Sequence, residues 1–467
     1  MAEEGHQVAV VMVPFPAQGH LNQLLHLSRL ISSYNIPIHY VCTPSHGRQA
    51  KIRVHGWDPL SVSNIHFHEF PTPSFISPPP NPHAAIKFPA HLQPSFDSSS
   101  YLRTPVSGLL RKLSAKFTRV VIIHDSLMGS VIQDFVTLFN TESYTFHSVS
   151  AFCLFFFLWE RIGIIRPSID EKLLKIVPSI EGCFTPEFLG FVKNQHDVIK
   201  YNSGRIYNSN RAIEGPFLDL LGKEEITDNK KQWALGPFNP VVKINGQKGS
   251  ERKHECLNWL DKQSPNSVIF ISFGTTTSLS DEQIREIAIG LEKSQQKFIW
   301  VLRDADKGDV FNVQGLIRSI ELPDGFEKRI QGKGLLVRNW APQLEILEHF
   351  ATGGFMSHCG WNSCMESLSM GVPMATWPMH SDQPRNAALI TEILRVGLVV
   401  KEWCRRDEVI KASEVEKVVR DLMGSDSEIG AELRKRAAEL GVVVRRSMGE
   451  GGVTRKELDD FIAHIIR

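Results

Sequence analysis

Short apolar runs alternate with helical segments along the first half of the chain. An apolar run at residues 8–15 (VAVVMVPF) is followed by residues 21–34 (LNQLLHLSRLISSY), whose leucines and isoleucines recur with helical spacing. Such runs, buried on both faces and separated by helices, predict a parallel sheet covered by helices on both sides. Further apolar runs lie at residues 36–44, 64–70, 119–126, 144–152 and 205–210.

The second half repeats this alternation, with apolar runs at residues 267–275, 297–303, 335–342, 353–360 and 373–378. The polar, glycine-bearing stretch 241–254 (VVKINGQKGSERKH) between the halves has the composition of a linker. We therefore expect an α/β protein with two Rossmann-like, doubly wound parallel-sheet domains that face a cleft. The expected parts are an N-terminal domain (1–242), a linker (243–253), a C-terminal domain (254–452) and a final helix (453–467).

Charge and cysteine content restrict the class of partner. The chain has 52 basic and 51 acidic residues, a balance that gives no electrostatic reason to bind nucleic acid or an anionic membrane. Seven cysteines without a C-x-x-C pair indicate reduced thiols and a cytoplasmic location. The apolar stretch 151–165 contains Glu160 and Arg161 and is too short to span a bilayer, and the acidic start is not that of a signal peptide. We expect a cytoplasmic, monomeric protein that binds small molecules.

Residues 340–383 contain the largest concentration of side chains that could bind a ligand (WAPQLEILEHFATGGFMSHCGWNSCMESLSMGVPMATWPMHSDQ). A short apolar strand ends at His358, and a helix is predicted to begin near Asn362 and Ser363 after a glycine-bearing turn. The start of a helix offers unpaired backbone N–H groups and the positive end of the helix dipole, which favour phosphate. This turn therefore predicts an anion site with His358 facing the same anion.

The residues around that turn extend the prediction to a nucleotide. Trp340 offers a flat apolar face on which a base can stack, and Gln343 follows it closely. Glu366 lies about one helical turn beyond the helix start, where its carboxylate can accept hydrogen bonds from both hydroxyls of a ribose. A buried tryptophan, a capping serine and a core helix explain each residue singly, but not the ordered set.

The whole window resembles the signature box of plant family 1 UDP-sugar glycosyltransferases, which adopt the GT-B fold. The resemblance implies that Trp340 stacks on uracil, that Gln343 and Glu366 bind the ribose, and that His358, Asn362 and Ser363 hold the diphosphate. It also implies that the donor site includes Ala341, that Asp382 and Gln383 bind the sugar hydroxyls, and that Trp361 and a terminal Gln favour UDP-glucose. Pentose-transferring members share both features, so UDP-xylose stays open. No metal or other cofactor is expected beside the UDP-sugar.

The catalytic prediction rests on strand ends in both halves. An acceptor hydroxyl has a high pKa and needs a base as it attacks, and His20 stands after the first strand. Asp125 ends another strand, where it can orient and balance the imidazole. Thr275, in the SFGT turn, can add a donor for the departing UDP. A capping or loop histidine and a helix-capping aspartate are the structural alternatives. The absence of G-x-G-x-x-G counts against a dinucleotide oxidoreductase.

The acceptor side is predicted from the first half. Residues 71–94 are rich in proline and aromatic residues and predict an irregular wall, which with Phe15 and Phe152 suggests an apolar pocket. Gln23, where most relatives have Pro, and the motifs VHGW, IHFHEF and SPPPNP are similar to the zeatin O-glucosyltransferase and zeatin O-xylosyltransferase branch of the family. Phenols and other small alcohols stay open as acceptors. The acceptor or the sugar is expected to contact Gln18, Asn22, His147 and Ser148.

Two further motifs favour a structural interpretation. Asp304 and Asp306 form a D-x-D pattern, but its polar, glycine-bearing loop indicates solvated charge rather than a metal–UDP site. His66 and His68 share one strand face without an evident third ligand. Two functions remain: an inverting O-glycosyltransferase, and a catalytically silent hormone-binding module on the same fold, which saturable binding without UDP release would reveal.

Overall fold

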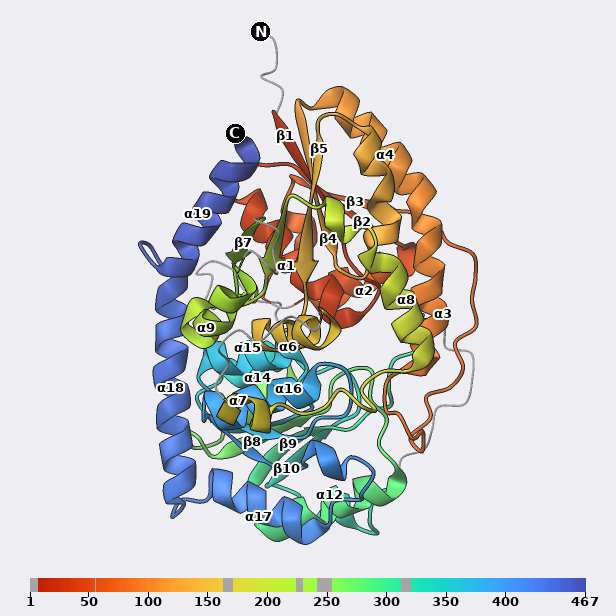
Figure 1. Ribbon diagram of the computed structural model, residues 1–467. Coiled ribbons are helices and arrows are strands. Elements are labelled where there is room, and N and C mark those ends of the chain that lie inside the picture. The colour runs from red at the N-terminus through yellow and green to blue at the C-terminus, as the bar shows by residue number, and fades with distance from the viewer. Residues whose placement is uncertain (1–6, 55, 163–170, 224–229, 242–253, 312–320) are drawn as a thin grey trace.

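The computed structural model describes residues 7–54, 56–162, 171–223, 230–241, 254–311 and 321–467. Within them lie two sheets, one above the other in Figure 1, and every recorded strand pairing is parallel. Their strand orders are β3-β2-β1-β4-β5-β6-β7 and β10-β9-β8-β11-β12-β13, so in each sheet the strand order reverses beside the first strand. The prediction of two doubly wound parallel sheets is therefore confirmed.

The first sheet forms where the sequence has its leading apolar runs; all six residues of β1 are buried. The strands are β1 (Val8–Val13), β2 (Ile38–Cys42), β3 (Ile65–Glu69), β4 (Arg119–Asp125), β5 (Thr141–His147), β6 (Gly204–Tyr207) and β7 (Lys231–Ala234). The helices are α1 (Gln18–Ser32), α2 (Pro44–Arg53), α3 (Gln93–Ser98), α4 (Arg103–Lys116), α5 (Gly129–Ile132), α6 (Ala151–Ile162), α7 (Glu171–Ile176), α8 (Pro186–His196) and α9 (Arg211–Leu221).

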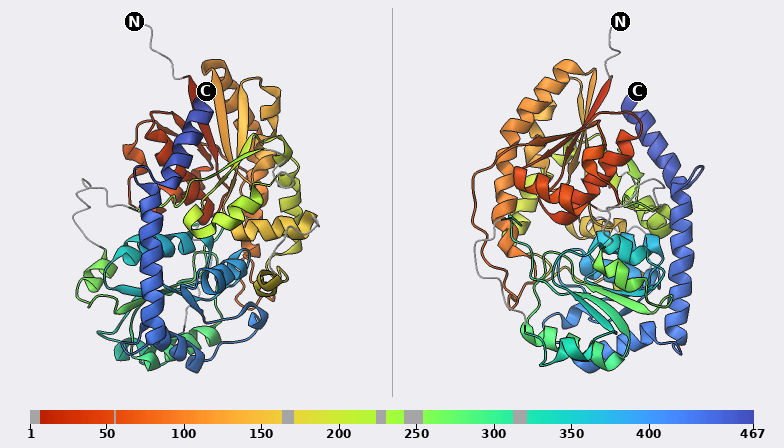
Figure 2. Two further views of the ribbon diagram at one scale, coloured as in Figure 1. Left: turned by 60° about the vertical axis from the view of Figure 1, so that its left-hand side comes forward. Right: turned by 180° about the vertical axis from the view of Figure 1, so that it is seen from behind.

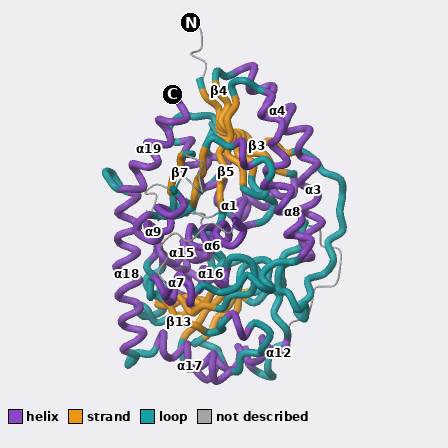
Figure 3. The backbone as a smooth tube through the Cα atoms, in the orientation of Figure 1, coloured by secondary structure: helices purple, strands orange, loops and turns teal. Residues whose placement is uncertain are grey.

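The second sheet is formed by shorter strands between amphipathic helices. Its strands are β8 (Val268–Ser272), β9 (Lys297–Val301), β10 (Gly334–Val337), β11 (Thr352–Ser357), β12 (Met374–Thr376) and β13 (Gly397–Val399). The helices are α11 (Glu255–Leu260), α12 (Asp281–Ser294), α13 (Phe326–Arg329), α14 (Gln343–Glu348), α15 (Trp361–Met370), α16 (Gln383–Ala388), α17 (Ala412–Met423), α18 (Glu428–Met448) and α19 (Val453–Ile466). Figure 3 shows α6, α15 and α16 between the two groups of strands.

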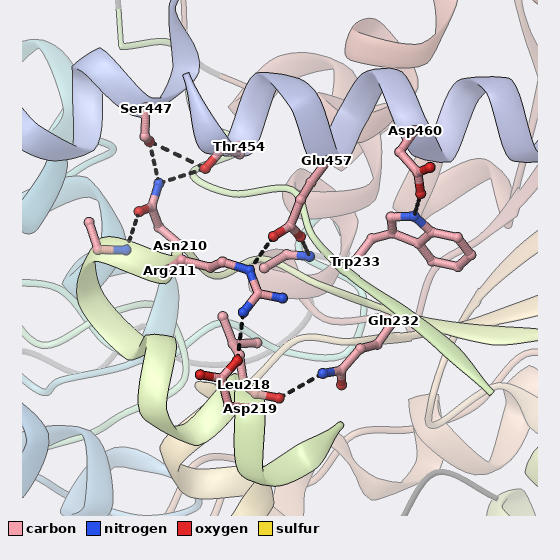
Figure 4. Close-up of polar contacts among 12 residues, drawn as sticks. Asn210, Arg211, Leu218, Asp219, Gln232, Trp233, Ser447, Thr454, Glu457 and Asp460 are labelled. Carbon is pink, nitrogen blue, oxygen red and sulfur yellow. Dashed lines mark hydrogen bonds and ion pairs between the residues drawn. The ribbon is translucent and has the colours of Figure 1, made fainter. Parts of the chain in front are cut away.

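Helices α18 and α19 run along one side of the molecule, past both sheets (Figures 1 and 2). Leu458, Phe461 and Ile465 of α19 pack into the core on one face of the first sheet. Polar contacts also bind α19 to the first half of the chain: Trp233 of β7 donates its indole N–H to Asp460 at 2.8 Å, and Glu457 is paired with Arg211 of α9 (Figure 4). The chain end is thus bound to the half from which it is most distant in sequence.

Three features predicted from sequence are placed as follows. The stretch 71–94, predicted to be irregular, contains neither helix nor strand at residues 71–89, but a 3-10 turn at Ala90–Leu92 and the start of α3 at Gln93 make its last five residues helical. The predicted linker 243–253 falls outside the described residues. Among the described helices, none combines the length and the apolar character that crossing a membrane would require.

Candidate functional site

A cavity of about 650 Å³ lies between the two sheets and is lined by residues of both. His147 ends β5 and Ser272 ends β8, so the cavity opens at the carboxyl ends of the parallel strands, where open α/β sheets bind ligands. All the predicted site residues except Asp125 and Phe152 line it: Phe15, Gln18, His20, Asn22, His147, Ser148, Thr275, Trp340, Ala341, Gln343, His358, Trp361, Asn362, Ser363, Glu366, Asp382 and Gln383. The structure therefore brings the predicted groups together, and their binding roles stay predictions.

The predicted catalytic pair is formed by α1 and β4. His20 lies in the first turn of α1, and its Nδ1 is 2.7 Å from Oδ2 of Asp125. The Asp125 side chain is fully buried, and its other oxygen accepts the backbone N–H of Leu127 at 2.9 Å. Because a carboxylate only accepts hydrogen bonds, Nδ1 of His20 carries the proton and Nε2 is left as a base. The ring of Phe15 packs edge-on against the imidazole at 5.0 Å between centroids.

The first turn of α15, where the sequence predicts an anion site, lies next to the start of α1, which carries His20. The helix begins after Gly360, and no side chain caps it, so its first backbone N–H groups have no side-chain acceptor. Asn362 donates its amide to the carbonyl of Gly19 at 2.8 Å, which joins this helix start to the start of α1. Two helix starts from opposite domains thus meet at the cavity.

His358 lies between two close backbone segments of this anion site. A Cβ on Gly274, whose φ is +77°, would lie 2.5 Å from Nε2 of His358, and one on Gly360 would lie 2.6 Å from it. Only glycine permits this approach. Burial lowers the pKa of His358 to about 4, so the ring is neutral at physiological pH and offers one N–H donor rather than a full charge.

The predicted ribose and base residues form a connected group. Gln343, the first residue of α14, donates its amide N–H groups to Oε2 of Glu366 at 2.7 Å and to Oγ of Ser363 at 2.9 Å. Trp340 is half-buried and lines the cavity just before α14. Gln343 thereby holds the carboxylate of Glu366 at the wall of the cavity.

The predicted sugar-binding residues are held by internal hydrogen bonds. Oε1 of Gln383 accepts the backbone N–H groups of Met379 and His380 at 2.9 and 3.1 Å. Asn386 donates to Asp382 at 2.7 Å, and burial raises the pKa of Asp382 to about 6. Trp361 is almost fully buried, and its indole N–H donates to the carbonyl of Asn208 at 2.7 Å, across to the first half.

The predicted acceptor contacts come from α1 and β5. Gln18 and Asn22 are hydrogen-bonded to each other at 2.7 Å, and the carbonyl of Ser148 accepts from Gln23 at 3.3 Å. His147 is buried and stacks on Tyr207 at 5.6 Å between centroids. Its Nε2 has no hydrogen-bond partner among the described residues, and its pKa is lowered well below the usual value by burial and by nearby Arg205. This neutral imidazole is part of the cavity wall.

Sequence reasoning missed much of the acceptor wall. Helix α8 supplies Phe188, Val192 and His196 to the cavity, and Phe88 and Arg205 also line it. The segment carries a capping signal, because Thr185 caps α8 and Pro186 begins it. That signal predicts a helix but says nothing of what the helix faces.

Two interpretations from sequence are corrected. Phe152 does not line the cavity; it packs in the core against Phe156 and Phe217, whereas Phe157 and Leu158 of the same helix face the cavity. Asp306 is not solvated loop charge, because its side chain is 9% exposed and pairs with Arg53 and Arg303.

The paired strand histidines acquire a third neighbour that the sequence did not indicate. Nδ1 of His39 lies 2.8 Å from Nε2 of His68, and His66 is in register with His39 on the adjacent strand. Within the described residues, however, no group of three or more His, Cys, Asp or Glu side chains has an arrangement that can hold a metal ion.

Comparison with known proteins agrees with this geometry. A profile of the glycosyltransferase N-terminal domain matches residues 6–240, and a profile of UDP-glucoronosyl and UDP-glucosyl transferase matches residues 198–422. Zeatin O-glucosyltransferase of Phaseolus lunatus is 56% identical over 98% of this chain and 97% of its own length. Zeatin O-xylosyltransferase of Phaseolus vulgaris is 53% identical over 99% of this chain and 98% of its own length.

The fold comparison reaches proteins of lower identity. The crystal structure of Medicago truncatula UGT71G1 complexed with UDP-glucose has a TM-score of 0.75, with 26% identity and 99% of both chains covered. The predictions of the GT-B fold and of a UDP-sugar-dependent transferase are confirmed. The chain is a UDP-glycosyltransferase and belongs to the UDP-glucoronosyl and UDP-glucosyl transferase family.

Proposed function

We propose that this protein transfers glucose from UDP-glucose, with inversion, to the side-chain hydroxyl of the cytokinin zeatin. The observation that carries the reaction is the His20–Asp125 pair, which faces the uncapped start of α15 across one cavity. The relatives named for zeatin, one of which is 56% identical over nearly the whole chain, support the acceptor.

The lining of the cavity supports a flat acceptor with a nitrogen-bearing ring. Phe15, Phe88 and Phe188 offer apolar surface, and the rings of Phe88 and Phe188 lie 4.5 Å apart between centroids. His147, His196 and Arg205 line the same cavity with nitrogen-bearing side chains. Aromatic walls suit a planar ring, and the N–H donors suit the ring nitrogens of a purine, which accept hydrogen bonds.

The proposed mechanism is a single displacement. Nε2 of His20 removes the proton of the acceptor hydroxyl as its oxygen attacks the anomeric carbon. The buried Asp125 holds the imidazole in the required tautomer and balances the positive charge that it gains. The bond from the anomeric carbon to the diphosphate breaks on the opposite side, so the configuration at that carbon inverts.

The departing UDP would be stabilised by the second domain. The first N–H groups of α15, the neutral imidazole of His358 and the Thr275 turn provide donors where negative charge grows. We further propose that Trp340 stacks on uracil, that Gln343 and Glu366 bind the ribose, and that Asp382 and Gln383 bind the sugar. UDP-sugar is a co-substrate in this scheme, which uses no metal ion.

We also propose the domain division 1–242 and 254–452, with residues 453–467 returning to the first domain. The packing of α19 on the first sheet and the extent of the N-terminal profile, residues 6–240, support this division. A monomer in the cytoplasm is proposed as well. The support for the location is that all seven cysteines are free thiols, six of them buried.

UDP-xylose is the second candidate donor, because the relative that is 53% identical is named for O-xylosyl transfer. The purified protein would be given equal concentrations of UDP-glucose and UDP-xylose with trans-zeatin, cis-zeatin, a phenol and a small allylic alcohol without the purine. Mass spectrometry identifies the product, and NMR reports the anomer. We expect a β-glucoside of zeatin. Preferential xyloside formation would establish the alternative donor, and transfer only to the phenol would refute the acceptor.

A further inference from the structure

An ion pair joins the two domains beside the predicted uracil site. Arg53, the last residue of α2 in the first domain, donates from one guanidinium nitrogen to Asp306 at 2.5 Å and from the other at 3.3 Å. Asp306 lies in the loop after β9 of the second domain. The two side chains are only 14% and 9% exposed, so solvent screens this bidentate pair far less than it screens a surface ion pair.

The guanidinium of Arg53 also stacks on the predicted uracil-binding residue. Its central carbon lies 4.8 Å from the ring centroid of Trp340, within the range of a cation–π contact. Trp340 lines the cavity, whereas Arg53 is not among the described residues that line it. The guanidinium therefore packs against an indole that itself borders the cavity.

The loop that carries Asp306 is fixed from both domains. The backbone N–H of Asp306 donates to the carbonyl of Thr275 at 2.6 Å, and the carbonyl of Asp306 contacts Nε2 of His91 at 2.9 Å. Arg303, which lines the cavity, pairs with the same carboxylate. Asp306 is thus a junction between the donor loops and the first domain.

We propose that Arg53 is a positioning residue of the UDP-sugar site that the first domain contributes. Its guanidinium packs against the Trp340 indole and fixes the plane of that ring, and Asp306 holds the guanidinium in place, so the base-stacking surface is complete only when the two domains are in contact. This inference rests on the proposed role of Trp340. It also gives the D-x-D loop a function: the second aspartate of this motif anchors the domain contact.

The test is calorimetric titration of UDP into wild type, Arg53→Ala, Asp306→Ala and the double variant. A partly buried cation–π contact with its ion pair corresponds to a loss of about 5- to 30-fold in UDP affinity for either single variant. The double variant should bind no more weakly than the weaker single variant, because both remove the same arrangement. Arg53→Lys should recover part of the loss, since lysine keeps the charge but not the planar stack.

Two readouts separate positioning from general damage. The KM for UDP-glucose should rise while the KM for the acceptor stays within twofold. The control is Lys51→Ala, a substitution on the same helix as Arg53, which removes a 2.7 Å ion pair with Glu69 of β3 and should leave UDP affinity unchanged. UDP affinity within twofold of wild type in Arg53→Ala, with a large loss in Trp340→Ala, would refute the inference and leave the proposed function intact. Unchanged affinity in Trp340→Ala would refute the base-stacking role and the inference with it.

Discussion

The two walls of the cavity are constructed differently. On the wall proposed to bind the UDP-sugar (the donor wall, formed by residues 340–383), polar side chains hold one another at hydrogen-bond distance, as in the contact of Gln343 with Glu366 at 2.7 Å. The acceptor wall is a set of aromatic rings, such as Phe15 and Phe96 at 4.5 Å between centroids. Directional bonds fix one ligand geometry, whereas ring contacts select mainly for shape.

The two walls should therefore control different properties: one the affinity for the donor, the other the preference among acceptors. Substitutions on the donor wall should change the affinity for UDP-glucose equally for every acceptor. Substitutions on the acceptor wall should change the preference among acceptors and leave the donor affinity unchanged. His20 lies where the walls meet and should affect turnover with every substrate pair.

The largest effect is expected at that meeting point. His20→Ala removes the proposed base, and kcat should fall by about 10³-fold, within the range for general base catalysis. The affinity for UDP, measured by calorimetry, should change by less than twofold. His83→Ala, which removes an exposed imidazole outside the cavity, is the control and should keep wild-type turnover. A kcat for His20→Ala within tenfold of wild type would show that another group accepts the proton.

The next effect tests the donor wall. Glu366→Gln removes a charge that accepts from Gln343 and is predicted to accept from the ribose, and charged hydrogen bonds contribute about 1.5–3 kcal/mol. The KM for UDP-glucose should therefore rise about 10- to 100-fold, by the same factor with zeatin and with a phenol. Glu439→Gln on the exposed face of α18 is the matched control. An effect that depends on the acceptor would break the separation between the walls.

The donor wall was predictable from sequence because its residues are contiguous. The window 340–383 forms successive strands, turns and helix starts, so its order along the chain becomes proximity in space. Trp340, His358 and Glu366 needed no long-range information beyond the position of one sheet edge. The alternation of apolar runs and helices was likewise sufficient for the two parallel sheets.

The acceptor wall was not predictable to the same extent because its residues depend on tertiary packing. The first part of α6 is apolar on all sides, so its pattern does not determine which residues face the cavity; Phe152 faces the core and Leu158 faces the cavity.

The ion pair of Asp306 could not be predicted either. The partners of Asp306 include Arg53, 253 positions away in the chain, so no local pattern could show that the charge of Asp306 is paired.

A pH dependence should appear on the donor wall. Burial raises the pKa of Asp382 to about 6, and the ionised carboxylate accepts hydrogen bonds from sugar hydroxyls more strongly than the neutral acid does. Its contribution is present above pH 6 and is lost as the pH falls through 6, so UDP-glucose should bind about tenfold more weakly at pH 5 than at pH 8. Burial lowers the pKa of His358 to about 4, so that ring stays neutral over this range. Calorimetry at each pH measures this, and a slope that persists in Asp382→Asn would assign it to another group.

The smallest effect tests the acceptor wall. Leu158 of α6 is half-buried and lines the cavity, and Leu158→Ala removes apolar contact from the acceptor without removing any hydrogen bond. A partial loss of apolar burial of about 1 kcal/mol corresponds to a rise of about fivefold in the KM for zeatin. The KM for UDP-glucose should stay within twofold, because none of the donor-wall contacts involves this side chain. Bulkier acceptors should gain relative to zeatin, since the variant enlarges the cavity. Leu60→Ala, at an exposed leucine, is the control. An equal rise in both KM values would mean that α6 supports the whole site, and that the two walls are not independent.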